Sequence, residues 1–251
     1  MRIKYEFFSE KPIIVPYFYN EGIQAIIYDY LLPAKSKFLH EEGFPWGKRK
    51  FKFFTFSKIL EKPKLLKEKK LFDFGYHISF ILSSPFEWIL IETAESLIRT
   101  ESIRFFRNNI ILSSVNVPSG KEFHPEKEMT FKTISPVTVY STYRNRKKPF
   151  YYYSPNEIGF FIQIIENLKK KFHTFYGVQY EKDIRLKIVK INLTHGKQVV
   201  WFKKRPITAW NFVGKIEAER EMLYLAYYAG IGAKNSAGFG CIEEVRNVRS
   251  T

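Results

Sequence analysis

Cysteine is nearly absent from this sequence. Cys241 is the one cysteine in 251 residues, which excludes a disulfide framework and a zinc site built on several thiolates. No stretch approaches the roughly eighteen consecutive apolar residues of a membrane-spanning helix. The charged N-terminal stretch MRIKYEFFSEKP also lacks the apolar run of a signal peptide. These absences predict a soluble protein of the reducing cytoplasm.

Metal-binding and nucleotide-binding signatures are missing as well. The five histidines have no paired spacing, the stretch HEEGF is not HExxH, and there is no DxD pair. The glycine-rich stretch GIGAKNSAGFG, residues 230–240, does not match GxxxxGK[ST], and Asn235 occupies the third glycine position of GxGxxG. Both of those motifs lead from a strand into a helix, whereas here an apolar-periodic helix precedes the glycines. We therefore expect no resident metal and no cofactor.

Acidic residues are too few to balance the basic ones. The 41 Lys and Arg exceed the 25 Asp and Glu by 16, which predicts a polyanionic partner, either nucleic acid or an anionic membrane surface. Aromatic residues make up 18% of the chain, and rings beside cations suit single-stranded nucleic acid. Most of the phenylalanines are expected to fill the core. No basic amphipathic helix of adequate length supports a membrane surface.

Hydrophobic periodicity predicts two similar halves, each with the element order βαββαβ of the ferredoxin-like fold. In the first half the expected elements span residues 2–8, 20–32, 52–59, 76–82, 86–98 and 103–117, the last being a strand or hairpin. In the second half they span residues 130–140, 155–172, 184–192, 199–214, 216–229 and 237–246. We predict an α+β protein with tandem ferredoxin-like domains, residues 1–120 and 125–251, joined through the polar, proline-containing segment 115–128.

Two predicted helices share a start signal. Residues 84–87 and 154–157 both read Ser-Pro-x-Glu, which is typical of a capping box with proline at the first helical position. Three lysines, residues 169–171, are expected to close the second of these helices, where cations complement the helix dipole.

Basic residues gather in three places. Between Trp46 and Lys70 there are ten Lys or Arg and two Glu, interleaved with aromatic residues. Such runs are often only a solvated face, but the interleaved rings favour RNA binding. The predicted RNA-contacting cations are Lys48, Arg49, Lys50, Arg144, Arg146, Lys147, Lys148, Lys203, Lys204 and Arg205.

Three residues of the first half are candidates for chemistry. Tyr28 lies off the apolar stripe of its predicted helix, so packing does not require it. His40 follows Phe38 and Leu39, a placement that suits an exposed, titratable histidine at the end of a short helix. Lys52 lies in a predicted strand whose alternation does not fix the direction of its side chain. These residues alone leave a catalytic role and an ordinary surface role both open.

Four stretches, QAIIYDYL, FLHEEGF followed by KFFTFS, SPVTVY and GIGAKNSAGFG, occur in an order that spans most of the chain. With them the sequence resembles the CRISPR-associated repeat-RNA endoribonucleases, the Cas-six group of the RAMP superfamily. The glycine-rich stretch is the most specific of the four. The resemblance implies tandem ferredoxin-like, RRM-like domains, in agreement with the periodicity.

The resemblance also implies an activity. The family cleaves its repeat RNA, the precursor of crRNA, without metal, through attack of the 2′-hydroxyl on the adjacent phosphate, which leaves a 2′,3′-cyclic phosphate and a 5′-hydroxyl. By position, the catalytic residues of the family correspond to Tyr28, His40 and Lys52. Tyr30 is an alternative to Tyr28, and the neighbouring cations 48–50 are alternatives to Lys52. A RAMP-type subunit that binds CRISPR RNA without cutting it remains the competing hypothesis.

The glycine-rich stretch is predicted to be a binding or framework element rather than the catalyst. Glycines let backbone N–H groups approach phosphates closely, and central polar side chains add donors. The residues expected to contribute are Gly230, Gly232, Lys234, Asn235, Ser236, Gly238 and Gly240. The expected partner is repeat RNA, with membership of a CRISPR effector complex and pairing into a homodimer both left open.

Overall fold

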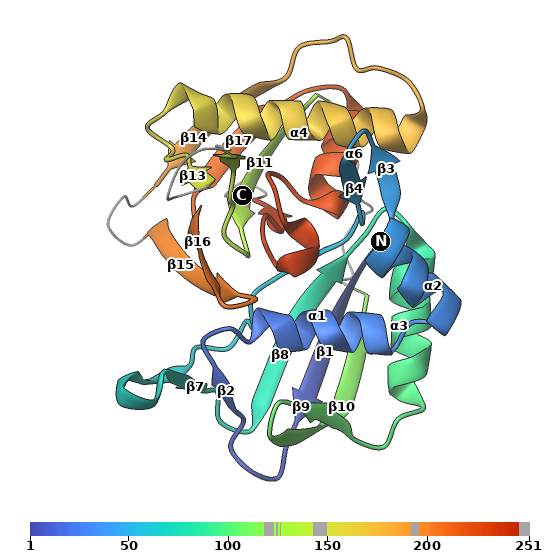
Figure 1. Cartoon of the computed structure of the whole chain (residues 1–251), viewed down its shortest axis with the longest axis vertical. Helices are drawn as coiled ribbons and strands as arrows, with labels where there is room; N and C mark the ends of the chain where they lie inside the picture. Colours follow the sequence, from blue (N-terminus) through green and yellow to red (C-terminus); the bar gives the residue numbers. More distant parts are fainter. Residues whose placement is uncertain (118–122, 124, 126, 143–149, 192–195, 246–251) are drawn as a thin grey trace, which may run out of the picture.

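Two antiparallel sheets, one from each half of the chain, form the framework of the protein (Figure 1). The structure is a computed structural model, and it describes residues 1–117, 123, 125, 127–142, 150–191 and 196–245. Within these ranges no helix is both long enough and apolar enough to cross a membrane.

The N-terminal half contains a five-stranded sheet in the order β5-β8-β1-β10-β9. Its first strand lies between the third and fourth strands of the βαββαβ unit, and all its pairings are antiparallel, which is the ferredoxin-like arrangement. The elements of this unit are β1 (Arg2–Phe8), α1 (Asn20–Asp29), β5 (Thr55–Phe56), β8 (His77–Ser83), α3 (Glu87–Ile98) and β10 (Asn108–Asn116), and β9 (Ile103–Phe105) adds a fifth strand at the edge beside β10.

Shorter elements decorate this half. The strands β2, β7 and β6 form a small projecting sheet, and β3 pairs with β4 as a hairpin. Their bounds, with those of the intervening helical turns, are β2 (Ile14–Pro16), α2 (Pro33–Lys37), the π-helical turn η1 (Phe38–Glu42), β3 (Phe44–Trp46), β4 (Arg49–Phe51), β6 (Lys64–Leu66), η2 (Lys67–Lys69) and β7 (Leu71–Asp73).

The C-terminal half repeats the same topology in a four-stranded sheet, β14-β17-β11-β18. The elements of its βαββαβ unit are β11 (Glu128–Thr133), α4 (Ile158–Tyr176), β14 (Arg185–Lys190), β17 (Val213–Glu217), α6 (Arg220–Ala229) and β18 (Ile242–Glu244). Further elements are β12 (Tyr140–Thr142), β13 (Phe150–Tyr152), β15 (Lys197–Phe202), β16 (Arg205–Trp210) and η3 (Asn235–Ala237). The predicted α+β class and tandem ferredoxin-like arrangement are confirmed.

The prediction of one strand over residues 199–214 was wrong. Residues 197–210 instead form the hairpin β15–β16, and the third strand of the sheet is β17. The turn is made by Lys203 and Lys204, with φ of 48° and 60°. Two successive residues with positive φ match the two-residue turn that suits the twist of a hairpin. In a sequence such turns are usually indicated by Asn or Gly, and here both positions are lysines, so the turn was not predicted. Consequently α6 begins at Arg220, not at residue 216.

The predicted ends of α4 also need correction. The helix begins at Ile158 rather than at residue 155, because Ser154–Glu157 form a turn in which the Glu157 carboxylate accepts a hydrogen bond from the Ser154 N–H at 2.5 Å. It continues to Tyr176 and ends at Gly177, which has left-handed φ. Lys171 therefore lies inside the helix, where it is 2% exposed.

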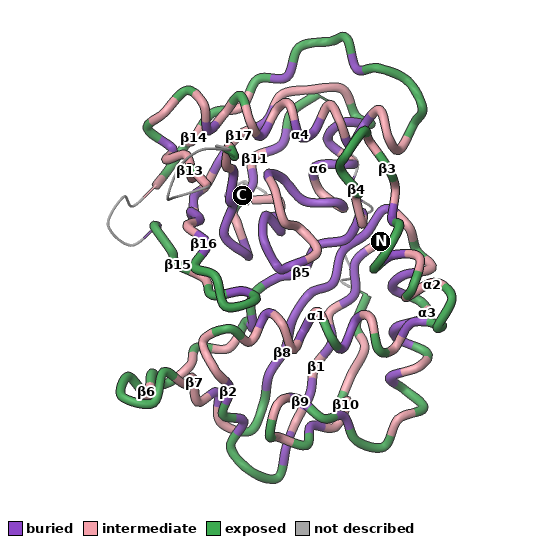
Figure 2. Tube along the Cα trace, in the orientation of Figure 1, coloured by how far each residue is buried: buried purple, intermediate pink, exposed green. Residues whose placement is uncertain are grey.

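Each half has its own hydrophobic core, seen as purple stretches on both sheets in Figure 2. Tyr5 and Phe80 represent the first core, and Phe131 and Ile216 the second. Phe53 comes from the N-terminal half but is buried in the second core, where its ring lies 5.5 Å from that of Phe175. The Phe53 side chain therefore connects the two halves through hydrophobic packing.

Arg2 adds a polar bond between the halves. It is 7% exposed, and its guanidinium donates to the carbonyls of Tyr227 and Ile242 at 2.5 Å each and to Ser83 Oγ at 3.1 Å. The guanidinium also lies 3.5 Å from the centroid of the Tyr227 ring. Buried charges are tolerated when they are hydrogen-bonded in this way, so β1 is fixed against α6 and β18.

The glycine-rich stretch runs between the halves and is packed on both sides. Gly238 has φ of 82°, and a Cβ there would lie 2.4 Å from the Phe56 ring. Gly240 has φ of 71°, and its Cβ would lie 1.9 Å from the Ile231 carbonyl oxygen. Both positions are buried, so the absence of a side chain at these glycines allows other parts of the protein to pack directly against the backbone. The predicted strand over residues 237–246 is reduced to Ile242–Glu244.

Gly240→Ala should destabilise the protein far more than Gly177→Ala. Both glycines have left-handed φ, but nothing lies within 4 Å of a Cβ at Gly177. The control should cost about 1 kcal/mol of backbone strain, whereas Gly240→Ala should cost at least about 3 kcal/mol more, because a backbone carbonyl must move. Urea unfolding of both variants checks this, and equal losses would contradict the packing assigned to the loop.

Candidate active site and inter-domain pocket

Tyr28 lies at the C-terminal end of α1. Ile23, Ile26 and Ile27 bury one face of this helix in the N-terminal core, and the tyrosine ring lies at the edge of that face. Burial raises the pKa of Tyr28 to about 12, so the phenol keeps its proton at neutral pH. Its ring meets that of His40 edge-on, with 5.7 Å between centroids.

His40 lies in a single π-helical turn. Pro33 opens α2, and the chain continues directly into the π-helical turn η1. Leu39 is fully buried and anchors the turn, whereas the adjacent His40 is exposed. The sequence predicted an exposed histidine near a short helix end, and the structure has that arrangement. A single π-helical turn is frequently found at functional sites.

Lys52 reaches the same turn from the other side. Its Nζ donates to the main-chain carbonyl oxygen of His40 at 3.0 Å and also to that of Leu39. Partial burial, together with the nearby Lys50, lowers the pKa of Lys52. The expectation of a continuous strand through Lys52 was wrong: β4 ends at Phe51, and positive φ at Phe53 breaks the strand before β5.

The three predicted residues thus approach one another from α1, from η1 and from the segment that follows β4. Tyr28 and His40 line one open surface hollow of about 480 Å³, and Lys52 ties the main chain beneath His40. Tyr30 lines a different hollow with Ile103 and Phe106, which separates it from His40. The arrangement places a neutral phenol and an exposed imidazole in one hollow, whereas the Lys52 ammonium donates to the main chain beneath His40 and lines a neighbouring pocket between the halves.

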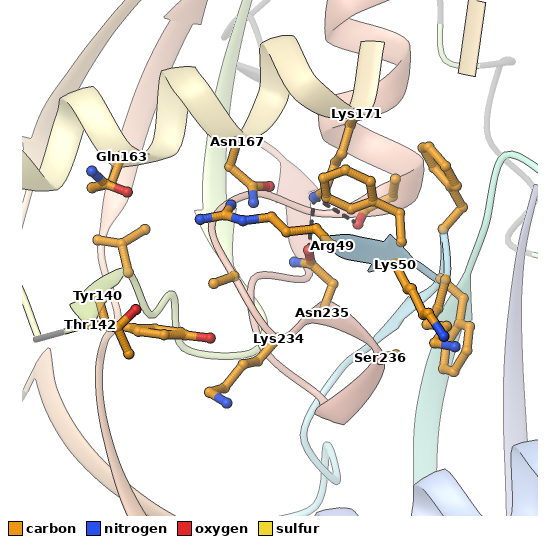
Figure 3. A pocket seen from close by; sticks show the side chains of 17 residues that line it. Arg49, Lys50, Tyr140, Thr142, Gln163, Asn167, Lys171, Lys234, Asn235 and Ser236 are labelled. Atoms are coloured by element: carbon orange, nitrogen blue, oxygen red, sulfur yellow. Dashed lines mark hydrogen bonds between the residues drawn. The ribbon is translucent and has the colours of Figure 1, made fainter. Parts of the chain in front are cut away.

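A second, deeper site lies between the halves. This inter-domain pocket has a volume of about 330 Å³ and opens beside the β3–β4 hairpin (Figure 3). Arg49 and Lys50, which were predicted to contact RNA, form one wall, and Lys50 donates to the Glu41 carbonyl at 2.7 Å. Lys48 is exposed in the same hairpin. The opposite walls come from α4, from β12 and from the tip of the glycine-rich stretch.

Lys171 and Asn235 hold that tip. Lys171 Nζ donates to Asn235 Oδ1 at 2.7 Å and to the Gly230 carbonyl at 2.6 Å. Asn235 Nδ2 donates to the carbonyls of Ile231 and Phe239, both at 3.0 Å. The amide of Asn235 is therefore used to brace the loop, and of the residues predicted for RNA contact in this stretch only Lys234, Asn235 and Ser236 reach the pocket.

The glycines of the stretch do not reach the pocket. Gly230, Gly232, Gly238 and Gly240 are all buried, and they line none of its wall. The stretch thus acts as a framework, one of the two roles expected for it, with a short polar tip facing the pocket.

Of the remaining cations predicted to contact RNA, three lie on an exposed hairpin and four lie outside the described residues. Lys203, Lys204 and Arg205 are exposed at the tip of the β15–β16 hairpin. The Lys203 N–H donates to Glu21 Oε1 at 2.7 Å, which brings this tip against the start of α1. Arg144, Arg146, Lys147 and Lys148 lie outside the described residues.

Sequence reasoning missed the polar stripe of α4. Gln163, Asn167 and Lys171 are spaced four residues apart, so they share one helix face, and all three line the inter-domain pocket (Figure 3). The spacing of polar residues beside the apolar Phe160 and Ile164 was the available signal. The run of three lysines concealed it, because it suggested a solvated helix end.

Comparisons with known proteins agree with this architecture. The family model described as CRISPR-associated protein Cas6, C-terminal, matches residues 119–244. The chain is 24% identical to "CRISPR-associated endoribonuclease Cas6 1" of Methanocaldococcus jannaschii, over 98% of this chain and 94% of that protein. It is 26% identical to "CRISPR-associated endoribonuclease Cas6" of Pyrococcus furiosus, over 94% of this chain and 85% of that protein.

Solved structures show the same fold. A Cas6-related protein of Pyrococcus furiosus superposes with a TM-score of 0.82 at 21% identity, covering 98% of this chain and 99% of the other. A RAMP protein described as binding different RNA substrates gives 0.81 at 21% identity, with coverage of 98% and 100%. The tandem ferredoxin-like sheets joined by a glycine-rich stretch define the fold class that the chain shares with these structures. More specifically, the chain belongs to the Cas6 family of CRISPR-associated proteins.

Lys171→Met should change how stability depends on pH. Burial lowers the pKa of Lys171 from 10.5 to about 7. Between these values the unfolded chain therefore binds a proton that the folded chain has released. The free energy of unfolding of the wild type, relative to Lys171→Met, should rise with pH across this window, by up to about 1.4 kcal/mol per pH unit, and stay level below it.

Chemical unfolding from pH 6 upward measures this difference. Lys169→Met removes one lysine from the same helix and controls for the loss of charge. A difference between wild type and Lys171→Met that does not change with pH would contradict the assignment.

Proposed function

We propose that this chain is an endoribonuclease that cleaves CRISPR repeat RNA without metal and so produces mature crRNA. The observation that carries the proposal is the meeting of Tyr28, His40 and Lys52 at the η1 turn. The names of the relatives, CRISPR-associated endoribonucleases, support the activity. The excess of 16 basic over acidic charges supports RNA as the partner.

The reaction is transesterification within the RNA. The 2′-oxygen loses its proton and bonds to the adjacent phosphorus, and the bond from phosphorus to the 5′-oxygen breaks. The departing 5′-oxygen takes a proton, so the products are a 2′,3′-cyclic phosphate and a 5′-hydroxyl. No water enters, and no oxidant or reductant is needed.

The three residues have distinct parts in this step. His40 is exposed, and its imidazole accepts the proton of the 2′-hydroxyl as the general base. Tyr28, with its pKa raised to about 12, stays neutral and donates a hydrogen bond to the phosphate or the departing oxygen. Lys52 fixes the main chain under His40, and its positive charge stabilises the developing oxyanion charge.

The same proposal divides the chain into a domain of residues 1–120 with the catalytic residues and a domain of residues 125–251 with the glycine-rich stretch. Arg2, Phe53 and the glycine-rich stretch join the two so closely that they are expected to bind RNA as one unit. Lys50 of the β3–β4 hairpin lines the inter-domain pocket and donates to the Glu41 carbonyl of the η1 turn, which suits a strand of RNA that passes from one site to the other.

His40→Ala should abolish cleavage and leave RNA affinity nearly unchanged. The loss of a general base lowers the rate about 10²- to 10⁴-fold, whereas an exposed imidazole adds little to binding. Single-turnover cleavage and equilibrium binding of a repeat RNA measure the two effects. His77→Ala, another exposed histidine at the start of β8, is the matched control and should cleave normally.

Two results would count against the proposal. Unchanged cleavage by His40→Ala would remove this residue from the mechanism. Tight binding of repeat RNAs with no cleavage by the wild type would instead favour a RAMP-type RNA-binding subunit, the activity that the name of one structural neighbour describes.

A further inference from the structure

One polar atom in the inter-domain pocket lacks a partner. Asn167 is 6% exposed, and among the described residues its Oδ1 is buried without a hydrogen bond. Figure 3 shows its amide directed into the pocket, with the Arg49 side chain beside it. A buried acceptor left unpaired destabilises a fold, so a donor that reaches Asn167 Oδ1 through the pocket would stabilise this site.

Asn167 is surrounded by other groups that can bind a ligand. Gln163 lies one turn earlier on the same face of α4 and presents a second amide to the pocket. Tyr140 provides an aromatic wall, and its ring is held 5.4 Å from the ring of Phe150. Lys234 Nζ lies 5.1 Å from the Tyr140 centroid. Two amides, one ring and flanking cations therefore surround a volume of about 330 Å³.

This set of groups matches the parts of a nucleotide. Aromatic side chains stack on nucleobases, and cations such as Arg49 and Lys234 neutralise phosphates. Side-chain amides pair with adenine in a bidentate manner, with the amide oxygen accepting from the N6 amino group and the amide nitrogen donating to a ring nitrogen. Uracil presents a carbonyl oxygen where adenine presents its amino group, so with the Asn167 amide oriented as it is here, uracil would face Oδ1 with a second acceptor.

We propose that the inter-domain pocket holds one unstacked adenine of the bound RNA, recognised by Asn167 and Gln163. The inference rests on the proposed function, because it takes RNA as the ligand, and it assigns base specificity to a site separate from the His40 turn. Lys171, on the same face of α4, shapes the pocket by holding the glycine-rich tip.

The test compares short oligoadenylate and oligouridylate of equal length. Binding to the wild-type protein is measured by fluorescence anisotropy in EDTA, and a gel confirms that the oligonucleotides stay intact. Oligoadenylate should bind at least about fivefold more tightly, as expected for one bidentate contact. Asn167→Ala should bring the ratio close to one, mainly by weakening the binding of oligoadenylate.

Two further variants separate a loss of adenine recognition from a loss of folding. Gln163 is only half-buried, so Gln163→Ala changes the pocket without leaving a cavity in the core. This variant should also lower the ratio of the affinities for oligoadenylate and oligouridylate. Asn109→Ala removes an exposed amide from β10 and should leave the ratio as in the wild type.

Each contrary result has a distinct meaning. Equal affinity of the wild type for both oligonucleotides would overturn the pocket assignment and leave RNA binding intact. Micromolar binding of AMP without any preference between the oligonucleotides would assign the pocket to a free nucleotide and also overturn it. Failure to bind either oligonucleotide or any repeat RNA would instead overturn the proposed function.

Discussion

The contact between Lys171 and the glycine-rich stretch is the constraint on which the rest of the structure depends. A lysine with 2% exposure donates to Asn235 and to the end of α6, and Asn235 in turn bridges both sides of its loop. The loop so shaped is bound from the other half by Asn20 and Gln24 of α1, at 3.0 and 2.6 Å. The relative position of the two sheets is thereby fixed by hydrogen bonds as well as by packing.

This framework also positions the candidate chemistry. Asn20, Gln24 and Tyr28 are spaced four residues apart and share one face of α1. The first two bind the glycine-rich stretch, and the third meets His40. On α4, Gln163, Asn167 and Lys171 repeat the same spacing. Two polar helix stripes therefore link the loop to the His40 turn on one side and to the inter-domain pocket on the other.

Much of the fold could be predicted from the sequence, because the periodicity of each half was strong and its element order complete. The β15–β16 hairpin was missed because lysines occupy the positive-φ turn positions that glycine or asparagine usually marks. The break before Phe54 was missed for a similar reason, since Phe53 takes positive φ without a glycine. The Tyr28–His40–Lys52 group was chosen with help from family resemblance, and its catalytic role stays a prediction. Asn167 and Lys171 were not predicted, because their burial depends on tertiary packing that local pattern does not contain.

Cleavage of repeat RNA in EDTA, with and without one 2′-deoxy sugar at the cut, tests the central claim most directly. If the chain cleaves by 2′-hydroxyl attack without metal, the unmodified RNA is cut at a single phosphodiester and the product carries a 2′,3′-cyclic phosphate. The 2′-deoxy RNA then binds equally well but stays intact. Loss of cleavage in EDTA that added Mg²⁺ restores, or cleavage of the 2′-deoxy RNA, would contradict this account.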